Sequence, residues 1–355
     1  MGKGPATAAC LIFAFVLFAY APALAQSEEV EPLDGEECVF NVQLENDLFG
    51  SGADNHYTQG LRFSYVFPVK TDSRKRKCIP FEDEFRTVAN TASAPIRDFL
   101  TTRNNRISLL FGQNIFTPDD ITRTDLIADD RPYAGWLYVG AGWVSERGTN
   151  GGGYMDNLEI NVGVVGPLSL AEQTQTWWHE VIDTREPRGW DHQLKNEPGL
   201  LISYERKWPI DLREGLGYKL ELTPSLGGAV GNVYTYASVG GMLRYGYKVP
   251  EDYGPPTIRP GLQGSGFFQR RKEWGWYLFA GVEGRAVARN IFLDGNTFRD
   301  SHSVDKKPLV ADLQVGLVMT YDRYRFGFTN IFRTKEFDGQ KRIDEFGSIN
   351  FSVLF

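Results

Sequence analysis

Apolar and polar side chains alternate over the last residues of the chain, in the run SINFSVLF from Ser348 to Phe355. Successive side chains of a β-strand point to opposite faces of the sheet. The run therefore predicts a strand with one apolar face and one polar face, and this strand ends on an aromatic residue. Such a strand requires an apolar environment on one side and polar groups on the other.

The same alternation recurs along the chain and predicts twelve strands. They are expected at residues 38–49, 57–68, 104–113, 133–147, 154–166, 199–208, 217–228, 232–247, 274–288, 309–321, 323–336 and 342–355. Most exceed the roughly 5–6 residues of an average globular strand and match the roughly 9–11 residues of a tilted membrane strand. The even number and the terminal Phe355 are typical of bacterial outer-membrane barrels. We expect an all-β fold, a transmembrane antiparallel β-barrel of about twelve strands. A soluble periplasmic β-sandwich, which also alternates, is the alternative.

The N-terminal segment is expected to be a signal peptide. Lys3 is followed by an apolar run over residues 8–24 that ends in an A-x-A pattern, as in secreted precursors. A retained anchor helix is the alternative. Residues 1–25 would be removed, residues 26–37 would form an acidic tail, and residues 38–355 would form the barrel. Removal of Lys3 takes the formal charge from −7 to −8, and an acidic chain gives no support for nucleic-acid binding.

An even number of strands places both chain ends on the periplasmic side, where the turns of such barrels are short. Three long loops then lie outside the cell, at residues 112–132, 167–198 and 289–308. Two segments expected on the periplasmic side, 69–103 and 248–273, are longer than this rule allows. They are the features that fit the predicted topology least well.

Two cysteines remain after the signal peptide is removed, Cys38 and Cys78. An exported chain reaches an oxidising compartment, in which disulfides form and persist. Cys38 begins the first predicted strand and Cys78 lies in the first periplasmic segment, so we expect both at the same rim of the barrel. A disulfide between them is geometrically plausible, and two free thiols are the alternative.

The loop at residues 167–198 is predicted to contain a helix, so the fold would include a helix in an extracellular loop. The run Ser169-Leu-Ala-Glu172 has capping-box spacing, which predicts a helix that begins near Leu170. Pro187 and Gly189 bound its end. A polar loop of this kind on a β-rich scaffold is a candidate active site, whereas a surface helix with solvated side chains is the alternative.

Gln175 and His179 are four residues apart, so they share one face of the predicted helix. They lie at the edge of an apolar arc formed by Trp178 and its neighbours. Neutral imidazole is a general base near physiological pH, and a histidine at the boundary of an apolar surface is well placed to meet a lipid ester. A hydrogen-bonded interface histidine without catalytic function is the alternative.

Polar residues of the first two strands are expected at the same rim as this loop. Alternation places Asp47 and Thr58 on the lumen side, while Asn46 interrupts the apolar face of its strand. Together with the loop of His179, they form a candidate site at the mouth of the barrel. Ordinary lumen polarity, with Asp47 paired to a cation such as Arg62, is the alternative.

The candidate ligands at this mouth are oxygen atoms. Asp47 and Glu197 are carboxylates of the kind that Ca²⁺ prefers, and the sequence has no His or Cys cluster with the spacing of a structural zinc site. It also contains no G-x-S-x-G nucleophile elbow and no P-loop or dinucleotide-binding fingerprint.

Several short motifs occur together in this chain. They are Glu45-Asn-Asp-Leu-Phe, Asp54-Asn-His-Tyr-Thr-Gln-Gly60, Asp130-Arg-Pro-Tyr-Ala-Gly-Trp136, Val165-Gly-Pro, the Gln175/His179 pair, Gly189-Trp-Asp-His-Gln-Leu-Lys-Asn-Glu-Pro-Gly199, Phe292-Leu-Asp-Gly-Asn296 and Arg333-Thr-Lys-Glu-Phe337. In combination the chain resembles the outer-membrane lipid A 3′-O-deacylase family over most of its mature length.

The resemblance implies an outer-membrane enzyme that removes the 3′-linked acyloxyacyl group from lipid A, with its active site facing the extracellular leaflet. It implies a Ca²⁺-dependent mechanism similar to that of secreted phospholipase A2, in which His179 activates a water. The positions that match the family's active site are Asn46, Asp47, Thr58, Gln175 and His179, with Glu197 as a further match. The family's lysine near the site has no clear counterpart, and Arg131 is the residue assigned to substrate phosphates in its place. An outer-membrane phospholipase and a non-enzymatic pore or scaffold barrel are the competing functions.

Overall fold

The computed structural model describes residues 37–49, 56–68, 87, 104–147, 153–258, 260–261 and 264–355. The expected signal peptide, almost all of the acidic tail and Cys78 lie outside these residues. Cys38 is disulfide-bonded and packs in a buried cluster with Phe67 and Trp143. Its expected partner lies outside the described residues, so the pairing with Cys78 stays a prediction.

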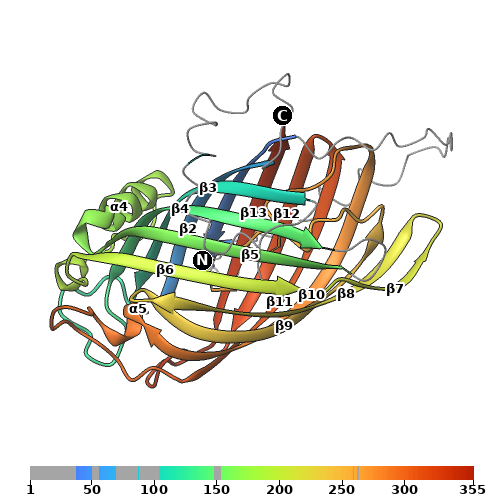
Figure 1. Ribbon diagram of the computed structural model, residues 1–355. Coiled ribbons are helices and arrows are strands. Elements are labelled where there is room, and N and C mark those ends of the chain that lie inside the picture. Colours follow the sequence, from blue (N-terminus) through green and yellow to red (C-terminus); the bar gives the residue numbers. More distant parts are fainter. Residues whose placement is uncertain are drawn as a thin grey trace. The chain divides into compact units, whose positions relative to one another are not determined.

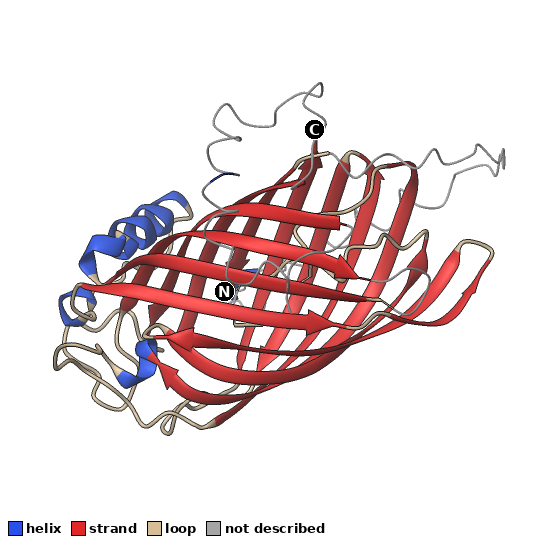
Figure 2. Ribbon diagram, in the orientation of Figure 1, coloured by secondary structure: helices blue, strands red, loops and turns tan. Residues whose placement is uncertain are grey.

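The strands close into an antiparallel barrel, which confirms the predicted fold (Figures 1 and 2). Their bounds are β1 Val39–Asn46, β2 His56–Pro68, β3 Asn104–Thr117, β4 Ala134–Arg147, β5 Tyr154–Val165, β6 Glu197–Lys207, β7 Ile210–Gly215, β8 Tyr218–Gly231, β9 Tyr234–Tyr247, β10 Arg271–Asn290, β11 Leu309–Asp322, β12 Tyr324–Arg333 and β13 Asp344–Leu354. Consecutive strands pair except β6 and β7, β1 pairs with β13, and β6 pairs with β8. The ring therefore holds the twelve expected strands, and β7 is an addition to it.

The short strand β7 was not expected from the sequence. Within the described residues it pairs only with β8, along the part of β8 that β6 does not reach. The two strands turn at Leu216 and Gly217, with φ values of 52° and 79°, so this tight turn needs two positive φ angles. Every residue of β7 is exposed. Its alternation is confined to Ile210-Asp-Leu-Arg213, a run too short to stand out from a loop.

The outer surface of the wall is apolar, because residues that oppose one another across neighbouring strands point to the same side. One such row crosses five strands and consists of Phe63, Phe111, Val139, Val162 and Leu200. The last four of these side chains are exposed. A continuous belt of exposed apolar side chains is what the lipid side of a membrane barrel requires.

The inner surface is polar, and its charges are paired. Arg62 donates to Glu159 at 2.7 Å, while Asp312 accepts from Arg285 at 2.8 Å and from Arg333 at 2.9 Å. Buried charges of this kind are tolerated only when each has a partner. Arg62 is engaged with Glu159 of β5, which weakens the alternative that it neutralises Asp47.

Residues 248–270 make up most of one of the long segments that fit the predicted topology poorly. They fold into the lumen as a plug. It enters at the end of the barrel where β9 ends and β10 begins. The main-chain N–H of Ile258 donates to Glu45 Oε1 at 2.8 Å, and Arg333 donates to the carbonyl oxygen of Pro260 at 3.0 Å. Both wall residues lie near the opposite end of their strands. The plug therefore runs along the lumen and is not a solvent loop.

Asp252 is the anchor of the plug. It is fully buried, and its carboxylate accepts from the Tyr277 hydroxyl at 2.9 Å, from Arg325 at 3.3 Å and from Arg244. One plug carboxylate is thus shared by two buried guanidinium groups of the wall, of which Arg244 also pairs with Glu221. This arrangement fills the lumen and argues against a pore.

The helices gather at one end of the barrel, which we call the helix end (Figure 2). They are the α-helices α4 Ala171–Val181 and α5 Ile291–Asp294 and the 3₁₀ helices η2 Asp47–Phe49, η4 Pro167–Ser169 and η5 Trp190–His192. Among the described residues, no helix is long and apolar enough to cross a membrane. The helix predicted in the loop after β5 is confirmed as α4.

Asp252→Ala should loosen the plug, because it leaves Arg244 and Arg325 buried without their shared carboxylate. Breaking a buried ion pair costs about 3–5 kcal/mol. We expect a lower midpoint of thermal unfolding and new ion conductance in planar bilayers, where the unaltered protein should be closed.

Asp338→Ala is the matched control, because it removes a mostly exposed carboxylate that pairs with Lys307, and such pairs contribute about 0–1 kcal/mol. Steady conductance of the unaltered protein, with no change in Asp252→Ala, would contradict the plug.

Candidate functional site

Helix α4 presents its polar side to the barrel. Its buried residues are Ala171, Gln175 and His179, which recur every four positions and so lie on one face. Trp177 and Val181 are 60% and 58% exposed. The expected shared face of Gln175 and His179 is confirmed, and it is the apolar side chains that face outward.

The start of α4 differs from the predicted capping box. Leu170 is the N-cap residue, with φ 59°, and no side chain caps the helix. Ser169 is instead fully buried at the end of η4, and its carbonyl oxygen accepts from Gln113 Nε2 at 2.6 Å. Packing of Ser169 against the wall has replaced the local cap that its sequence spacing suggested.

The buried face of α4 packs on the outer surface of β3 and β4. Ile115 of β3 shares a buried cluster with Ala171 of α4 and with Trp190 of η5. Gly135 of β4 lies so close to η4 and α4 that a Cβ there would be 2.1 Å from Ser169 Oγ and 2.2 Å from Ala171 Cβ. Only glycine allows this approach, which sets the helix tightly against the wall (Figure 1).

A bulge in β2 brings Thr58 to the same side of the wall. The register between β2 and β3 slips between Tyr57 and Gln59, and the extra residue is Thr58. Its hydroxyl lies 2.7 Å from that of Thr117, and Thr117 shares a strand face with Ile115, beneath α4. The expectation that Thr58 faces the lumen was wrong, because a bulge shifts the alternation of the strand by one residue.

Asn46 also belongs to this side. It lies opposite Gln59, which in turn lies opposite Ile115, and its Nδ2 donates to the carbonyl oxygen of Thr58 at 2.9 Å. Asp47 follows directly, buried at the start of η2. The wall thus carries Asn46 and Thr58 on its outer surface, on the two strands that precede β3 in the ring, where α4 packs.

Hydrogen bonds fix the two buried polar side chains of α4. His179 Nδ1 lies 2.5 Å from the carbonyl oxygen of Arg185. A carbonyl only accepts, so Nδ1 carries the proton and the ring's lone pair is on Nε2. Gln175 Oε1 accepts from Trp190 Nε1 at 3.0 Å, while its Nε2 is buried without a hydrogen-bond partner among the described residues. Such a buried polar atom marks a place for a polar ligand or water.

Glu197 has a different role from the one expected. Its carboxylate accepts from the main-chain N–H groups of Thr297 at 2.9 Å and Phe298 at 3.3 Å, and from Asn296 Nδ2 at 3.0 Å. It lies at the start of β6, five strands around the ring from β1. Glu197 therefore holds the loop that follows β10, and it leaves the proposed ligand set.

Arg131 is not placed to meet a substrate phosphate. It is 1% exposed, donates to Glu336 at 3.2 Å, and lies over the rings of Phe116 and Phe337. Burial raises the pKa of the Glu336 carboxyl, but the guanidinium groups of Arg333 and then Arg131 outweigh it and lower that pKa below its usual value. Arg131 is therefore part of the buried packing with Phe116 and Phe337.

Comparison with known proteins assigns the family. The family model described as "Outer membrane protein LpxR" matches residues 11–355. The chain belongs to the LpxR family. This confirms the family that the sequence motifs indicated and places the protein in the outer membrane. No curated protein sequence matched the chain.

Solved structures show the same fold as this LpxR-family chain. LpxR from Salmonella typhimurium superposes with a TM-score of 0.70 at 20% identity, covering 89% of this chain and 100% of that one. The β domain of the Bordetella autotransporter BrkA matches with a TM-score of 0.41 at 10% identity, covering 90% and 99%. The second match is too distant to carry an argument, and the first establishes the fold.

Sequence reasoning missed the residues that position this site. Trp190, which holds Gln175, lies in a motif that the sequence had singled out. Gly135 also lies in such a motif, Asp130–Trp136. Thr117 and Gln113 gave no signal, because their roles depend on the register of β2, β3 and β4 and on the place where α4 docks.

Gly135→Ala should displace α4, because the added methyl group would overlap Ser169 and Ala171. We expect faster hydrogen exchange of the α4 amides with the barrel intact. Gly284→Ala is the matched control, since a Cβ there meets nothing within 4 Å. Equal exchange of α4 in both variants would show that the helix is not held against the wall in this way.

Proposed function

We propose that this protein is a lipid A deacylase, which hydrolyses the 3′-linked acyloxyacyl ester of lipopolysaccharide in the outer leaflet of the outer membrane. The observation that carries the proposal is that the buried face of α4, with Gln175 and His179, packs on β3 and β4, next to the strands that carry Asn46 and Thr58 on the same outer surface. The chain's place in the LpxR family supports the same activity.

His179 is the proposed general base. The hydrogen bond from Nδ1 to the carbonyl oxygen of Arg185 orients the ring. Nε2 is the atom that would take a proton from a water, and a positioned base contributes about 10²–10⁴-fold to the rate. The amides of Asn46 and Gln175 and the hydroxyl of Thr58 are donors that can orient the ester and stabilise its developing oxyanion. No protein nucleophile is required.

The donor set at Asp47 suits Ca²⁺ better than Zn²⁺. Among the described residues there is no group of three or more His, Cys, Asp or Glu side chains that could hold a metal ion. Asp47 is the carboxylate at this rim, and Asn46 and Thr58 add neutral oxygens. Ca²⁺ accepts such a mixture together with main-chain oxygens and water. When bound, a cation would polarise the ester carbonyl and stabilise negative charge.

The outward side of α4 supports a lipid substrate. Leu168, Leu170, Trp177 and Val181 are exposed at the end of the wall whose outer surface carries the apolar belt. Acyl chains of a membrane lipid can therefore approach the site from the side without leaving an apolar environment. A pore is not favoured, because the plug fills the lumen, and a phospholipase remains the competing enzyme.

Purified protein in detergent, incubated separately with lipid A and with phosphatidylethanolamine, distinguishes the two enzymes. We expect release of the 3′-acyloxyacyl group from lipid A and little fatty acid from phosphatidylethanolamine. The reverse preference would assign the chain to the phospholipases.

His179→Ala should lower the deacylation rate by about 10²-fold or more, because it removes the general base. The barrel should remain folded, as judged by its mobility on unheated gels. His192→Ala is the control on the same loop, since His192 is exposed and bonds only weakly, at 3.2 Å, to the carbonyl oxygen of Thr124. A rate near normal in His179→Ala would remove this residue from the mechanism.

Chelation of Ca²⁺ should abolish deacylation, and added Ca²⁺ should restore it. Asp47→Asn should raise the Ca²⁺ concentration needed for half-maximal rate and lower the rate itself, because it removes the charged oxygen ligand. Glu197→Gln should leave the Ca²⁺ response unchanged, since its carboxylate serves the loop after β10. Full activity in excess chelator would contradict the hypothesis that a metal ion takes part in the reaction.

A further inference from the structure

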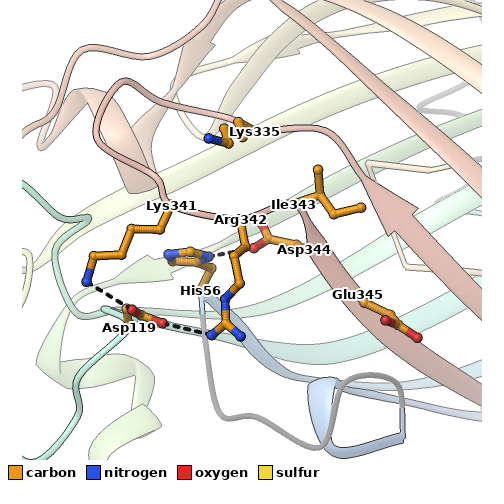
Figure 3. Close-up of a pocket in the computed structure, with 8 residues that line it drawn as sticks. All are labelled: His56, Asp119, Lys335, Lys341, Arg342, Ile343, Asp344 and Glu345. Carbon is orange, nitrogen blue, oxygen red and sulfur yellow. Dashed lines mark hydrogen bonds and ion pairs between the residues drawn. The ribbon is translucent and has the colours of Figure 1, made fainter.

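A cavity lies at the helix end, lined in part by residues close in the chain to the proposed cleavage site. It has a volume of about 450 Å³ and lies between the first residue of β2, His56, and the segment that joins β12 to β13 (Figure 3). Its lining residues are His56, Asp119, Lys335, Lys341, Arg342, Ile343, Asp344 and Glu345. None of the proposed catalytic residues belongs to it.

The rim of this cavity carries more positive charge than its nearest carboxylate neutralises. Asp119 lies 3.4 Å from Lys341 and 3.6 Å from Arg342, so one carboxylate is shared by two cations. Their side chains are 80% and 68% exposed. Lys335 takes part in none of the ion pairs found among the described residues. Three long cationic side chains can therefore converge on an anion at the mouth.

The floor of the cavity is built differently. His56 has a positive φ of 64°, and its Nδ1 lies 2.5 Å from Asp344 Oδ1. Gln340 Nε2 donates to that same oxygen at 2.9 Å. The other oxygen of Asp344, Oδ2, is buried without a hydrogen-bond partner among the described residues. A buried carboxylate oxygen in this state requires a donor such as a hydroxyl or amine.

The rim and the floor of the cavity thus suit a ligand that carries both an anionic group and a hydrogen-bond donor. The rim suits a phosphate, and the floor suits a sugar hydroxyl or amine. Inorganic phosphate alone would satisfy only the rim. A phosphorylated saccharide supplies both groups within one small molecule.

The cavity is also continuous with the proposed site along the chain. His56 precedes Thr58 by two residues, and Asp119 follows Thr117 by two. Thr58 and Thr117 are the hydroxyl pair beneath α4. A saccharide in the cavity would therefore hold its acyl esters near the groove of His179.

We propose that this cavity binds the phosphorylated saccharide head of the acylated substrate, with Lys335, Lys341 and Arg342 on the phosphate and Asp344 on a sugar hydroxyl or amine. The role of the cavity in hydrolysis rests on the proposed deacylase function. The binding experiment that tests the cavity does not. These cations take the part that sequence reasoning had given to the buried Arg131.

Binding to the full chain in detergent tests the proposal directly. The probes are glucosamine 1-phosphate, glucosamine and inorganic phosphate, measured by isothermal titration. We expect the unaltered protein to bind glucosamine 1-phosphate more tightly than either of the other two. The Lys335→Ala, Lys341→Ala, Arg342→Ala triple variant should lose at least about tenfold in affinity, since charge-assisted hydrogen bonds are the strong ones.

Two controls separate local from general effects. The triple variant Arg213→Ala, Lys272→Ala, Arg299→Ala removes the same charge from exposed positions elsewhere and should bind glucosamine 1-phosphate normally. Asp344→Asn should reduce the preference for glucosamine 1-phosphate over inorganic phosphate. Unchanged affinity in the cavity triple variant, or equal binding of inorganic phosphate and glucosamine 1-phosphate, would overturn the proposal.

Kinetics distinguish a failure of this site from a failure of the proposed function. The cavity triple variant should have a lower kcat/KM for phosphorylated lipid A and an unchanged value for dephosphorylated lipid A. If the unaltered protein hydrolyses neither lipid while the cavity still binds glucosamine 1-phosphate, the deacylase function fails and the site stands. If hydrolysis proceeds and the triple variant shows no phosphate-dependent loss, the site fails and the function stands.

Discussion

In β2, one extra residue between Tyr57 and Gln59 determines which side of the barrel wall the end of the strand serves. Without the bulge, Thr58 would point into a lumen that is already filled by paired charges and by the plug. With it, the hydroxyl of Thr58 lies 2.7 Å from that of Thr117 on the outer surface. The polar residues of the site depend on this shift, because it places them on the outer surface, on which α4 packs.

The inner and outer surfaces of the wall differ in polarity. The closed lumen and the site on the outer surface both follow from this difference. Inside, Asp252 and Asp312 neutralise arginines that no water reaches, and the plug occupies the remaining space. Outside, an apolar belt crosses the wall, Asn46 and Thr58 lie on the same surface beside the strands on which α4 packs, and the cavity at His56 is polar. A substrate with acyl chains and a charged saccharide head matches the outside of the barrel. Its acyl chains suit the apolar belt, and its head suits the polar cavity at His56.

Much of the fold follows from period-2 alternation, and the pairing of Gln175 with His179 follows from helical spacing. Both are local properties that a sequence displays. The bulge at Thr58 and the entry of residues 248–270 into the lumen depend on contacts between distant segments, so no local pattern reports them. The same holds for Glu197 and Ser169. Their sequence context suggested a ligand and a cap, but the loop after β10 and the wall at Gly135 engage them first.

Mass spectrometry of lipid A tests the central claim most directly. Lipid A would be extracted from cells that carry the unaltered chain, the His179→Ala variant or neither, after each barrel has been shown to be folded in the outer membrane. The proposed function predicts a species that lacks the 3′-acyloxyacyl group only in cells with the unaltered chain. Identical lipid A in all three strains, including under conditions with added Ca²⁺, would contradict it.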